Sequence, residues 1–401
     1  MVSKKILIIT TRLPYPETAG FKKRILAFSK ILKKNGYSIS LFYSYISKND
    51  SKVPSELYKI YDNIYPLKVS KLEALFNVIK SFISGEPVQT NLYYSKKIRE
   101  ALNNIVEKEK PNILFFNFNR SAKYISFVSD FKCRKIIDLH DAVSKHYLEA
   151  LKEKFVSSFW KFFYRYEGKK LKIFEINQKN FFDGLILISP TDKEFLFGNL
   201  EETNNITVIP IGVDKKLLEY DNEERDNTIT FIGKMNYYPN VDAVVHFAKD
   251  ILPNLEDKNI KFYIIGTNPS KEVLKLQNDR IVVTGFVEDP YELISKSKLM
   301  IAPVRFGGGM QNKILEGMAL GKTVITYEER AIPIIGYKNN ENLVTVNNTE
   351  EFIRELNYYL KRQDLRKKIG QNARKLIEEN YTWDVIEKKL INFIENIYYN
   401  D

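Results

Sequence analysis

The sequence holds one cysteine and three histidines in 401 residues, and each scarcity excludes a class of protein or site. The lone Cys133 cannot form an intrachain disulfide, which excludes a disulfide-stapled fold and favours a reducing compartment such as the cytoplasm. The histidines match no zinc-ligand spacing, so no metal site is expected. No apolar run approaches the ~18 residues of a membrane-spanning helix. The first apolar run of the chain, residues 5–10, is expected to be a buried strand rather than part of a signal peptide.

Positive charge is concentrated in the first half of the chain. Residues 1–200 hold about 35 Lys and Arg against about 19 Asp and Glu, within a net charge of +12 for the whole chain. An anionic membrane surface and an anionic acceptor are candidate partners for this half, and a lysine-rich solvated surface is the alternative. Nucleic acid is not expected, because no zinc-finger, RNP-like or basic-heptad pattern occurs. The aromatic and basic segment 154–166 would touch an anionic leaflet, unless its regularly spaced phenylalanines belong to a core.

Short β-rich apolar runs alternate with longer amphipathic segments along the whole chain. The runs are residues 5–10, 38–45, 112–118, 135–140 and 184–189, then 228–233, 261–266, 281–286, 299–304, 323–327 and 342–346. This alternation is typical of parallel sheets with helices on both faces. It predicts an α/β protein with two Rossmann-like, doubly wound domains. Residues 1–209 form the first domain together with a C-terminal helix, 382–401, and residues 210–381 form the second. Because such sheets bind ligands beyond the carboxyl ends of their strands, we expect the active site in the cleft between the domains.

Three consecutive glycines, residues 307–309, stand between a predicted buried strand and a predicted helix. Glycines let a ligand approach the backbone, and the free N–H groups of a helix start favour an anion. Lys313 would add positive charge, and Glu316, three residues further on the same face, could accept hydrogen bonds from ribose hydroxyls. These groups together predict a nucleoside-diphosphate site. A tight turn followed by a surface Lys–Glu pair is the alternative.

Other loops after predicted strands carry further candidate groups. Lys234 follows Gly233, and its ammonium is either a counter-charge for phosphate or a solvated group. His140 ends a strand between Asp138 and Asp141, and we expect it to hydrogen-bond substrate rather than bind a metal. The loop after the first strand lacks the G-x-G-x-x-G spacing of a dinucleotide site, so NAD binding is not expected.

The order and spacing of these motifs resemble the retaining glycosyltransferases of family 4, which have the GT-B fold, in the branch that acts on surface polysaccharides. The resemblance covers essentially the whole chain, and its segments are IPIGVD (209–214), FIGKMNYYPNVDAV (231–244), VVTGFVEDPYELISKSKLMIAPV (282–304), GGGMQNKILEGMALGKTVI (307–325), HDAVSKHY (140–147) and YTWDVI (381–386). The resemblance implies catalytic roles for His140, Lys234, Lys313 and Glu316, donor contacts from Gly20, Gly233, Phe286, Val287, Gly307, Gly308, Gly309, Met310 and Gln311, and acceptor-side contacts from Arg12, Asp138 and Asp141.

Two departures of the sequence from the family pattern matter for the expected site. The family usually carries two glutamates separated by seven residues, and the first would fall on Gly308, which affects the choice of sugar and the catalytic geometry. The second lysine of the donor loop falls on Asn240. We expect Lys313 to supply the missing positive charge.

The function implied by the resemblance is transfer of a sugar, with retention of configuration, from a nucleoside-diphosphate sugar to a glycan, lipid-linked or protein acceptor. It would serve cell-surface polysaccharide or glycoconjugate biosynthesis, in the cytoplasm or docked on the inner face of the plasma membrane. No metal, cofactor or protein nucleophile is implied, and catalysis would rest on positioning and on stabilising the departing diphosphate. A sugar-nucleotide epimerase or hydrolase of the same fold and a non-catalytic nucleotide-sugar-binding partner are the alternatives.

Overall fold

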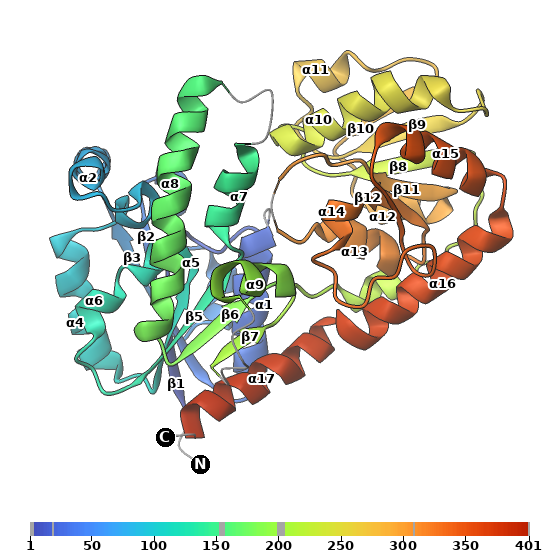
Figure 1. Ribbon diagram of the computed structural model, residues 1–401. Helices are drawn as coiled ribbons and strands as arrows, with labels where there is room; N and C mark the ends of the chain where they lie inside the picture. The colour runs from blue at the N-terminus through green and yellow to red at the C-terminus, as the bar shows by residue number, and fades with distance from the viewer. Residues whose placement is uncertain (1–3, 18–19, 152–156, 199–204, 308, 400–401) are drawn as a thin grey trace. The chain divides into compact units, whose positions relative to one another are not determined.

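The computed structural model describes residues 4–17, 20–151, 157–198, 205–307 and 309–399. The chain forms two compact units: unit 1 is Met1–Pro210 with Glu387–Asp401, and unit 2 is Ile211–Ile386. In Figure 1, unit 1 holds the blue-to-green part of the chain and the red C-terminal end. The predicted boundaries lie one residue from the first crossing and five from the second. The second crossing falls inside the continuous helix α17, Trp383–Tyr399, and not in the loop before it.

Unit 1 contains a parallel sheet of seven strands in the order β3-β2-β1-β4-β5-β6-β7. Five strands coincide with predicted runs, whereas the outer strands β3 and β7 escaped the apolar pattern. The outer strand β3 has no fully buried residue and contains Pro66, which an edge strand tolerates, and β7 is only three residues long. The strands are β1 (Lys5–Thr10), β2 (Ser38–Tyr45), β3 (Asn63–Lys68), β4 (Ile113–Asn117), β5 (Arg134–His140), β6 (Gly184–Leu187) and β7 (Ile206–Val208).

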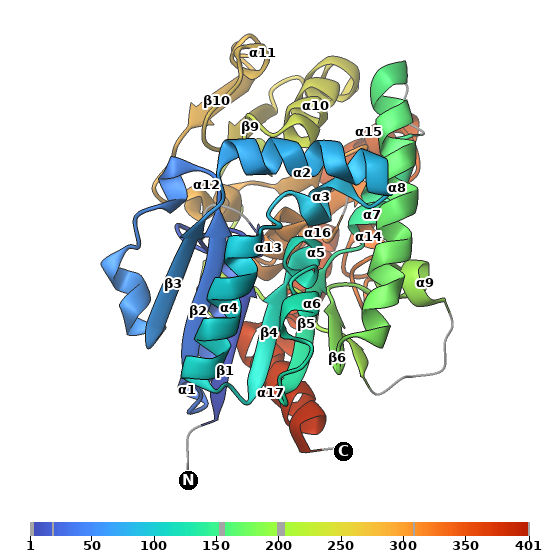
Figure 2. The same ribbon diagram turned by 90° about the vertical axis from the view of Figure 1, so that its left-hand side faces the viewer.

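Helices cover both faces of this sheet, as Figure 2 shows with α4, α5 and α6 in front of the strands and α1 behind them. Successive strand residues point to opposite faces, so Leu7 joins the core beneath α4 while Phe115 packs against Phe28 of α1. The helices are α1 (Gly20–Lys34), α2 (Lys71–Ser84), α3 (Val88–Asn91), α4 (Lys96–Glu109), α5 (Phe118–Ala122), α6 (Ile125–Val128), α7 (Val143–Ala150), α8 (Ser158–Asn177) and α9 (Pro190–Phe197), with the end of α17.

Unit 2 contains a six-stranded parallel sheet in the order β10-β9-β8-β11-β12-β13. Its strands are β8 (Thr228–Ile232), β9 (Lys261–Ile265), β10 (Ile281–Gly285), β11 (Leu299–Ala302), β12 (Val324–Tyr327) and β13 (Val344–Val346), all within or overlapping predicted runs. Its helices are α10 (Tyr238–His246), α11 (Lys271–Leu274), α12 (Pro290–Lys296), α13 (Asn312–Ala319), α14 (Glu328–Ala331), α15 (Thr349–Leu360), α16 (Gln363–Asn380) and the start of α17. Helices α10 and α15 share one core cluster with the strands. The two sheets confirm the predicted doubly wound α/β architecture. Within the described ranges, no helix has the length and apolar character needed to cross a bilayer.

Candidate functional site

The order of strands in unit 2 reverses between β8 and β11, so the loops after these two strands form the switch point of this sheet. Ligands of open α/β sheets bind at such a point, outside the carboxyl ends of the strands. The loop after β8 begins with Gly233 and Lys234, and the loop after β11 carries the glycine segment and leads into α13. The predicted donor loops are therefore brought together at the place where a ligand is expected.

Lys313, in the first turn of α13, lies at the centre of this switch point. Its ammonium donates hydrogen bonds to two neutral amide oxygens, Asn240 Oδ1 at 3.0 Å and Gln311 Oε1 at 3.2 Å. It also lies 5.2 Å from the centre of the Phe231 ring. Burial lowers the pKa of Lys313 to about 8, although the negative charge of Glu316 opposes this shift. A lysine held by neutral partners keeps its positive charge available for an anion.

Asn240 replaces the second donor-loop lysine and organises the loop instead. Its side chain is 5% exposed, and its Nδ2 donates to the backbone carbonyl of Lys234 at 3.0 Å while its Oδ1 accepts from Lys313. One amide therefore links the loop after β8 to the helix after β11. The side chain of Lys234 itself is exposed.

The glycine loop ends at a helix start that no side chain caps. Gln311 is the N-cap residue of α13, and its side chain makes no capping hydrogen bond. Gly307 and Gly309 adopt positive φ angles of 112° and 74°, and Met310 is buried beside them. Gly308 lies outside the described residues. An uncapped helix start presents backbone N–H groups to an anion, as predicted for this segment.

Two arginines anchor this loop, and the sequence analysis missed both. Arg330 on α14 is buried, and its Nη1 donates to the carbonyl of Gly307 while its Nη2 pairs with Glu329 at 2.9 Å. Arg305 forms a bidentate pair with Asp242 of α10, with Nε 2.9 Å from one carboxylate oxygen. These contacts fix the backbone of the loop before any ligand arrives.

Glu316 lies one turn after Lys313, and Tyr291 of α12 reaches it. Burial raises the pKa of Tyr291 above its ordinary value, and the charge of Glu316 and a hydrogen bond to its carboxylate raise it further. The phenol therefore stays protonated and donates to Glu316. The carboxylate is oriented by a neighbouring helix and retains acceptor capacity for other hydroxyls.

The carboxyl ends of β8, β9 and β10 approach one another through glycines. Gly266 has φ +150°, and a Cβ atom there would lie 1.7 Å from the carbonyl oxygen of Gly233. Only glycine fits this position. After β10, Phe286 is 77% exposed and Val287 is partly buried. An exposed aromatic ring at a strand end offers a flat apolar surface for a base.

Unit 1 has its own switch point between β1 and β4, and aromatic rings gather there. The guanidinium of Arg12 lies 5.8 Å from the centre of the Phe21 ring, which contacts Phe118 edge-on at 5.5 Å. The Phe118 ring lies 5.0 Å from that of His140. Phe118 and His140 adopt positive φ angles of 68° and 71°, which are rare for large side chains and concentrate at functional sites. Phe118 was missed, because its apolar run gave no sign of an unusual backbone.

Asp138 lies beneath this cluster in a buried ion pair. Its carboxylate is 2.7 Å from Nε and 3.1 Å from Nη2 of Arg24, and it accepts the backbone N–H of His140 at 3.2 Å. Arg24 also donates to the carbonyl of Pro210 at 2.9 Å. Asp138 is 2% exposed, so it positions the end of β5.

The remaining predicted groups of unit 1 lie at the ends of helices or beside His140. Asp141 is partly buried, 3.7 Å from Nδ1 of His146. Burial lowers the pKa of His140, which favours the neutral ring. Gly20 is the first residue of α1. Across the described ranges, no group of three or more His, Cys, Asp or Glu is arranged to hold a metal ion.

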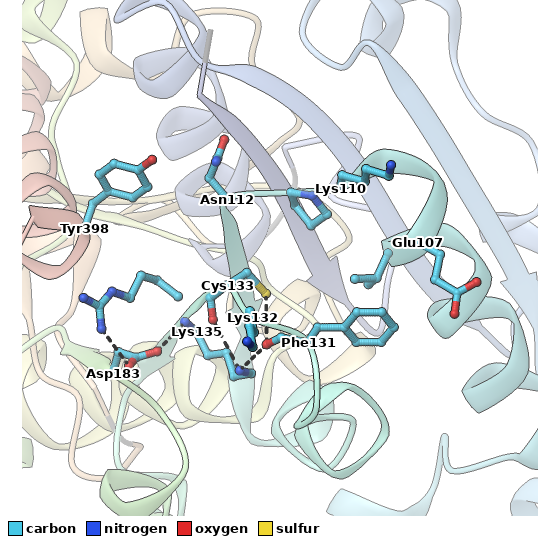
Figure 3. Close-up of a pocket in the computed structure, with 12 residues that line it drawn as sticks. Glu107, Lys110, Asn112, Phe131, Lys132, Cys133, Lys135, Asp183 and Tyr398 are labelled. Atoms are coloured by element: carbon cyan, nitrogen blue, oxygen red, sulfur yellow. Dashed lines mark hydrogen bonds and ion pairs between the residues drawn. The ribbon is translucent and has the colours of Figure 1, made fainter. Parts of the chain in front are cut away.

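Two cavities of similar size lie at opposite ends of the strands of unit 1. One, of about 900 Å³, lies at the amino ends of β4 and β5, with Asn112, Cys133 and Asp183 among its lining residues (Figure 3). The other, of about 890 Å³, lies after the carboxyl ends of β1 and β2; its lining includes Arg12, Lys22, Lys48, Lys71 and Asp50. The second lies at the edge that binds ligands in such sheets, and four of its five charged side chains are basic.

Comparison with known proteins identifies a glycosyltransferase domain in this chain. Residues 226–362 match the family model described as "Glycosyl transferases group 1". The whole chain superposes on sucrose-phosphate synthase from Thermosynechococcus elongatus with a TM-score of 0.70 at 13% identity, covering 99% of this chain and 100% of that one. Residues 226–362 therefore form a glycosyltransferase group 1 domain, and the chain as a whole has the GT-B fold.

Three curated relatives and a second solved structure are also similar to this chain. An uncharacterized 44.6 kDa protein from the cps region of Klebsiella pneumoniae is 23% identical, covering 94% of this glycosyltransferase and 96% of the relative. An uncharacterized glycosyltransferase of Methanocaldococcus jannaschii is 27% identical over 54% of the chain and 59% of its own length. The capsular polysaccharide biosynthesis glycosyltransferase CapM of Staphylococcus aureus is 24% identical over 51% and 60%. Anabaena HepE, in a complex with UDP, superposes with a TM-score of 0.66 at 11% identity, covering 98% of this chain and all of that one.

Sequence reasoning missed those residues of this glycosyltransferase that act through other residues. Tyr291, Arg305 and Arg330 lie on segments whose patterns are typical of ordinary helices and loops, and each touches a predicted site residue or loop only in the folded chain. A recognisable signal existed only for Gly266, which ends a buried run just as Gly233 does.

Proposed function

We propose that this glycosyltransferase moves a sugar, with retention of configuration, from a nucleoside-diphosphate sugar to a glycan or lipid-linked acceptor of a cell-surface polysaccharide. The observation that carries the proposal is the position of Lys313, held by neutral amides at the switch point of unit 2 beside an uncapped helix start. A positively charged group and free backbone N–H groups at one point suit a diphosphate. The relatives from capsule-related proteins support the polysaccharide assignment.

Unit 2 would bind the donor. Lys313, Lys234 and the N–H groups at the start of α13 would neutralise the diphosphate, Glu316 would accept the ribose hydroxyls, and Phe286 would lie against the base. When the bond between the anomeric carbon and the diphosphate oxygen breaks, negative charge grows on the diphosphate. These positive groups then bind it more tightly than they bind the intact donor, which lowers the barrier.

Unit 1 would bind the acceptor and the transferred sugar. The acceptor hydroxyl would attack the anomeric carbon from the side that the diphosphate leaves, and the departing oxygen would take its proton, so configuration is retained without a protein nucleophile. His140, oriented by Asp138, would hydrogen-bond the sugar. Arg12, which lines the mostly basic cavity at the carboxyl ends of β1 and β2, would contact an anionic acceptor. We also propose that the acceptor is reached at an anionic membrane surface.

A thermal-shift panel of nucleoside diphosphates tests the donor assignment. UDP is the first probe, because structural neighbours were solved with UDP and with UDP-glucose. A ligand at about 100 times its dissociation constant should add about 2.7 kcal/mol to the free energy of unfolding. If neither UDP nor any other nucleoside diphosphate shifts the transition, the donor site is wrongly assigned. Release of free sugar at the same rate with and without acceptor would instead indicate a hydrolase.

A further inference from the structure

Helix α2 of unit 1 turns its apolar side chains outward. Six large side chains on it are between 49% and 83% exposed: Leu72, Leu75, Phe76, Ile79, Phe82 and Ile83. Their spacing of three and four residues places them along one stripe of the helix. The buried positions of this helix are instead Ala74 and Ser81. The apolar side of this helix therefore faces away from the core, whereas the apolar side of an ordinary amphipathic helix packs on the core.

Hydrogen bonds join α2 to the rest of unit 1. Asn77 Nδ2 donates to the carbonyl of Tyr94 at 2.6 Å, and Asn91 Nδ2 donates to Ser81 Oγ at 3.1 Å. Ser70 and Glu73 form a complete capping box at the start of the helix. Hydrogen bonds and caps hold the helix in place, so its outward apolar stripe is a fixed surface feature.

The beginning of α8 extends this surface. The ring of Phe82 stacks on that of Tyr166 at 5.5 Å, so the end of α2 lies against α8, as Figure 2 also shows. One and two turns earlier on α8, Phe162 and Phe159 are 73% and 74% exposed, and Trp160 is half exposed. We call the six side chains of α2 together with Phe159, Trp160 and Phe162 the apolar face. These three belong to the segment for which a core position was the alternative, and the structure exposes them; Phe155 of that segment lies outside the described residues.

The charges around the apolar face favour an anionic partner. Lys71 and Lys80 are exposed on α2. The nearby acids are engaged within the unit: Glu73 in the capping box, Glu86 with Lys123 at 2.5 Å, and Glu167 by backbone N–H groups of α3. Within α2 and residues 158–166 of α8, which carry the apolar face, Lys71, Lys80, Lys161 and Arg165 outnumber Glu73, so the net charge of these segments is positive. A second copy of the same face would bring lysines toward lysines, whereas an anionic lipid surface would complement them.

We propose that the apolar face inserts into an anionic membrane surface, with α2 lying in the plane of the interface. Phenylalanine, tryptophan and leucine side chains flanked by lysines suit the boundary between headgroups and acyl chains. Lys71, the first residue of α2, also lines the basic cavity that contains Arg12. A lipid-linked acceptor in the same leaflet would therefore present its anionic group next to this cavity. The inference rests on the proposed membrane location and names the surface responsible.

Co-sedimentation with vesicles tests the proposal. The full chain is mixed at low salt with vesicles of phosphatidylcholine alone or with phosphatidylglycerol, and compared with the double variant Phe76→Ser/Ile79→Ser. The control is Ile173→Ser/Phe181→Ser, which removes side chains of similar size and exposure elsewhere in unit 1. We expect the wild type to bind the anionic vesicles, the first variant to lose at least tenfold in partition coefficient, and the control to bind within about twofold of wild type.

A second readout locates the contact. Brominated lipids should quench the fluorescence of Trp160 in the wild type, and Trp160→Phe should remove most of this quenching. The UDP-induced thermal shift must be the same in all variants, which separates loss of docking from misfolding and from failure of the donor assignment. Absent vesicle binding, or equal binding by both double variants, would overturn the proposal. A dimer in sedimentation that Phe76→Ser/Ile79→Ser converts to a monomer, without vesicle binding, would assign the face to a second copy.

Discussion

At its switch point, unit 2 carries glycines, an uncapped helix start and a lysine held by amides, whereas unit 1 carries aromatic rings above a buried ion pair. Both sheets are parallel and doubly wound, so the loops after their first and fourth strands converge in the same way. In unit 2 the positively charged group, Lys313, contacts neutral partners. In unit 1 Arg24 is neutralised by Asp138. The same topology therefore leaves a lysine with neutral partners in one unit and pairs an arginine with a buried carboxylate in the other.

The substitution with the largest expected effect removes Arg24 of unit 1. Arg24→Ala leaves the buried carboxylate of Asp138 without its partner, and breaking one partner of a buried pair typically costs about 3–5 kcal/mol. We expect the free energy of unfolding of unit 1, measured in urea, to fall by about this amount. Below the transition, UDP affinity should be unchanged, because the pair lies in unit 1. A loss of UDP affinity in the folded variant would contradict the division of roles between the units.

In unit 2, removal of the charge of Lys313 should have the next largest effect. Lys313→Ala should reduce donor kcat/KM by roughly 100- to 1000-fold, the usual cost of removing one group that stabilises transition-state charge. Lys313→Arg keeps the charge and should recover part of the activity. Steady-state kinetics with a nucleoside-diphosphate sugar measures both. Wild-type kinetics in a folded Lys313→Ala variant would mean that the glycine loop and helix are only a turn.

A substitution of Glu316 tests the ribose contact and should have a smaller effect. Glu316→Gln keeps the size of the side chain but removes its charge, and hydrogen bonds to charged groups contribute roughly 1.5–3 kcal/mol. Donor kcat/KM should therefore fall about ten- to a hundredfold. Tyr291→Phe is the matched control: it removes a donor to Glu316 but keeps the carboxylate, so a smaller loss is expected. An equal loss in both variants would show that Glu316 acts mainly through its contact with α12.

The smallest effect is a pH dependence that only unit 2 should show. Burial lowers the pKa of Lys313 to about 8, so the free protein holds a charged lysine below this pH and a neutral one above it. A diphosphate binds the charged form, so UDP affinity should be constant below about pH 8 and fall by up to about tenfold per pH unit above it. Calorimetric titration between pH 6 and 9.5 measures this profile. Lys313→Arg should flatten it, and a profile that stays unchanged in this variant would assign the titration to another group.

The sequence alone carried the architecture of both units. Hydrophobic periodicity predicts eleven of the strands, because a strand buried on both faces must be apolar along its length. Alternation with amphipathic segments then leaves a doubly wound parallel sheet as the simplest arrangement. Glycine placement predicted the loop before α13, because positive φ angles at Gly307 and Gly309 need residues without a Cβ. Local patterns of this kind depend only on neighbours along the chain.

The tertiary structure decided which polar groups are structural and which remain available. Asp138 and Asp141 look equivalent in the sequence, yet Asp138 is buried against Arg24, 114 residues away. Arg330 gave no signal, because its contact with Gly307 joins α14 to a loop 23 residues earlier in the chain. The helical spacing of α2 could not show that its apolar stripe faces outward, since periodicity gives a stripe but not the direction it faces. That direction depends on the hydrogen bonds of Asn77 and Ser81 with residues of other segments, which exist only in the folded unit.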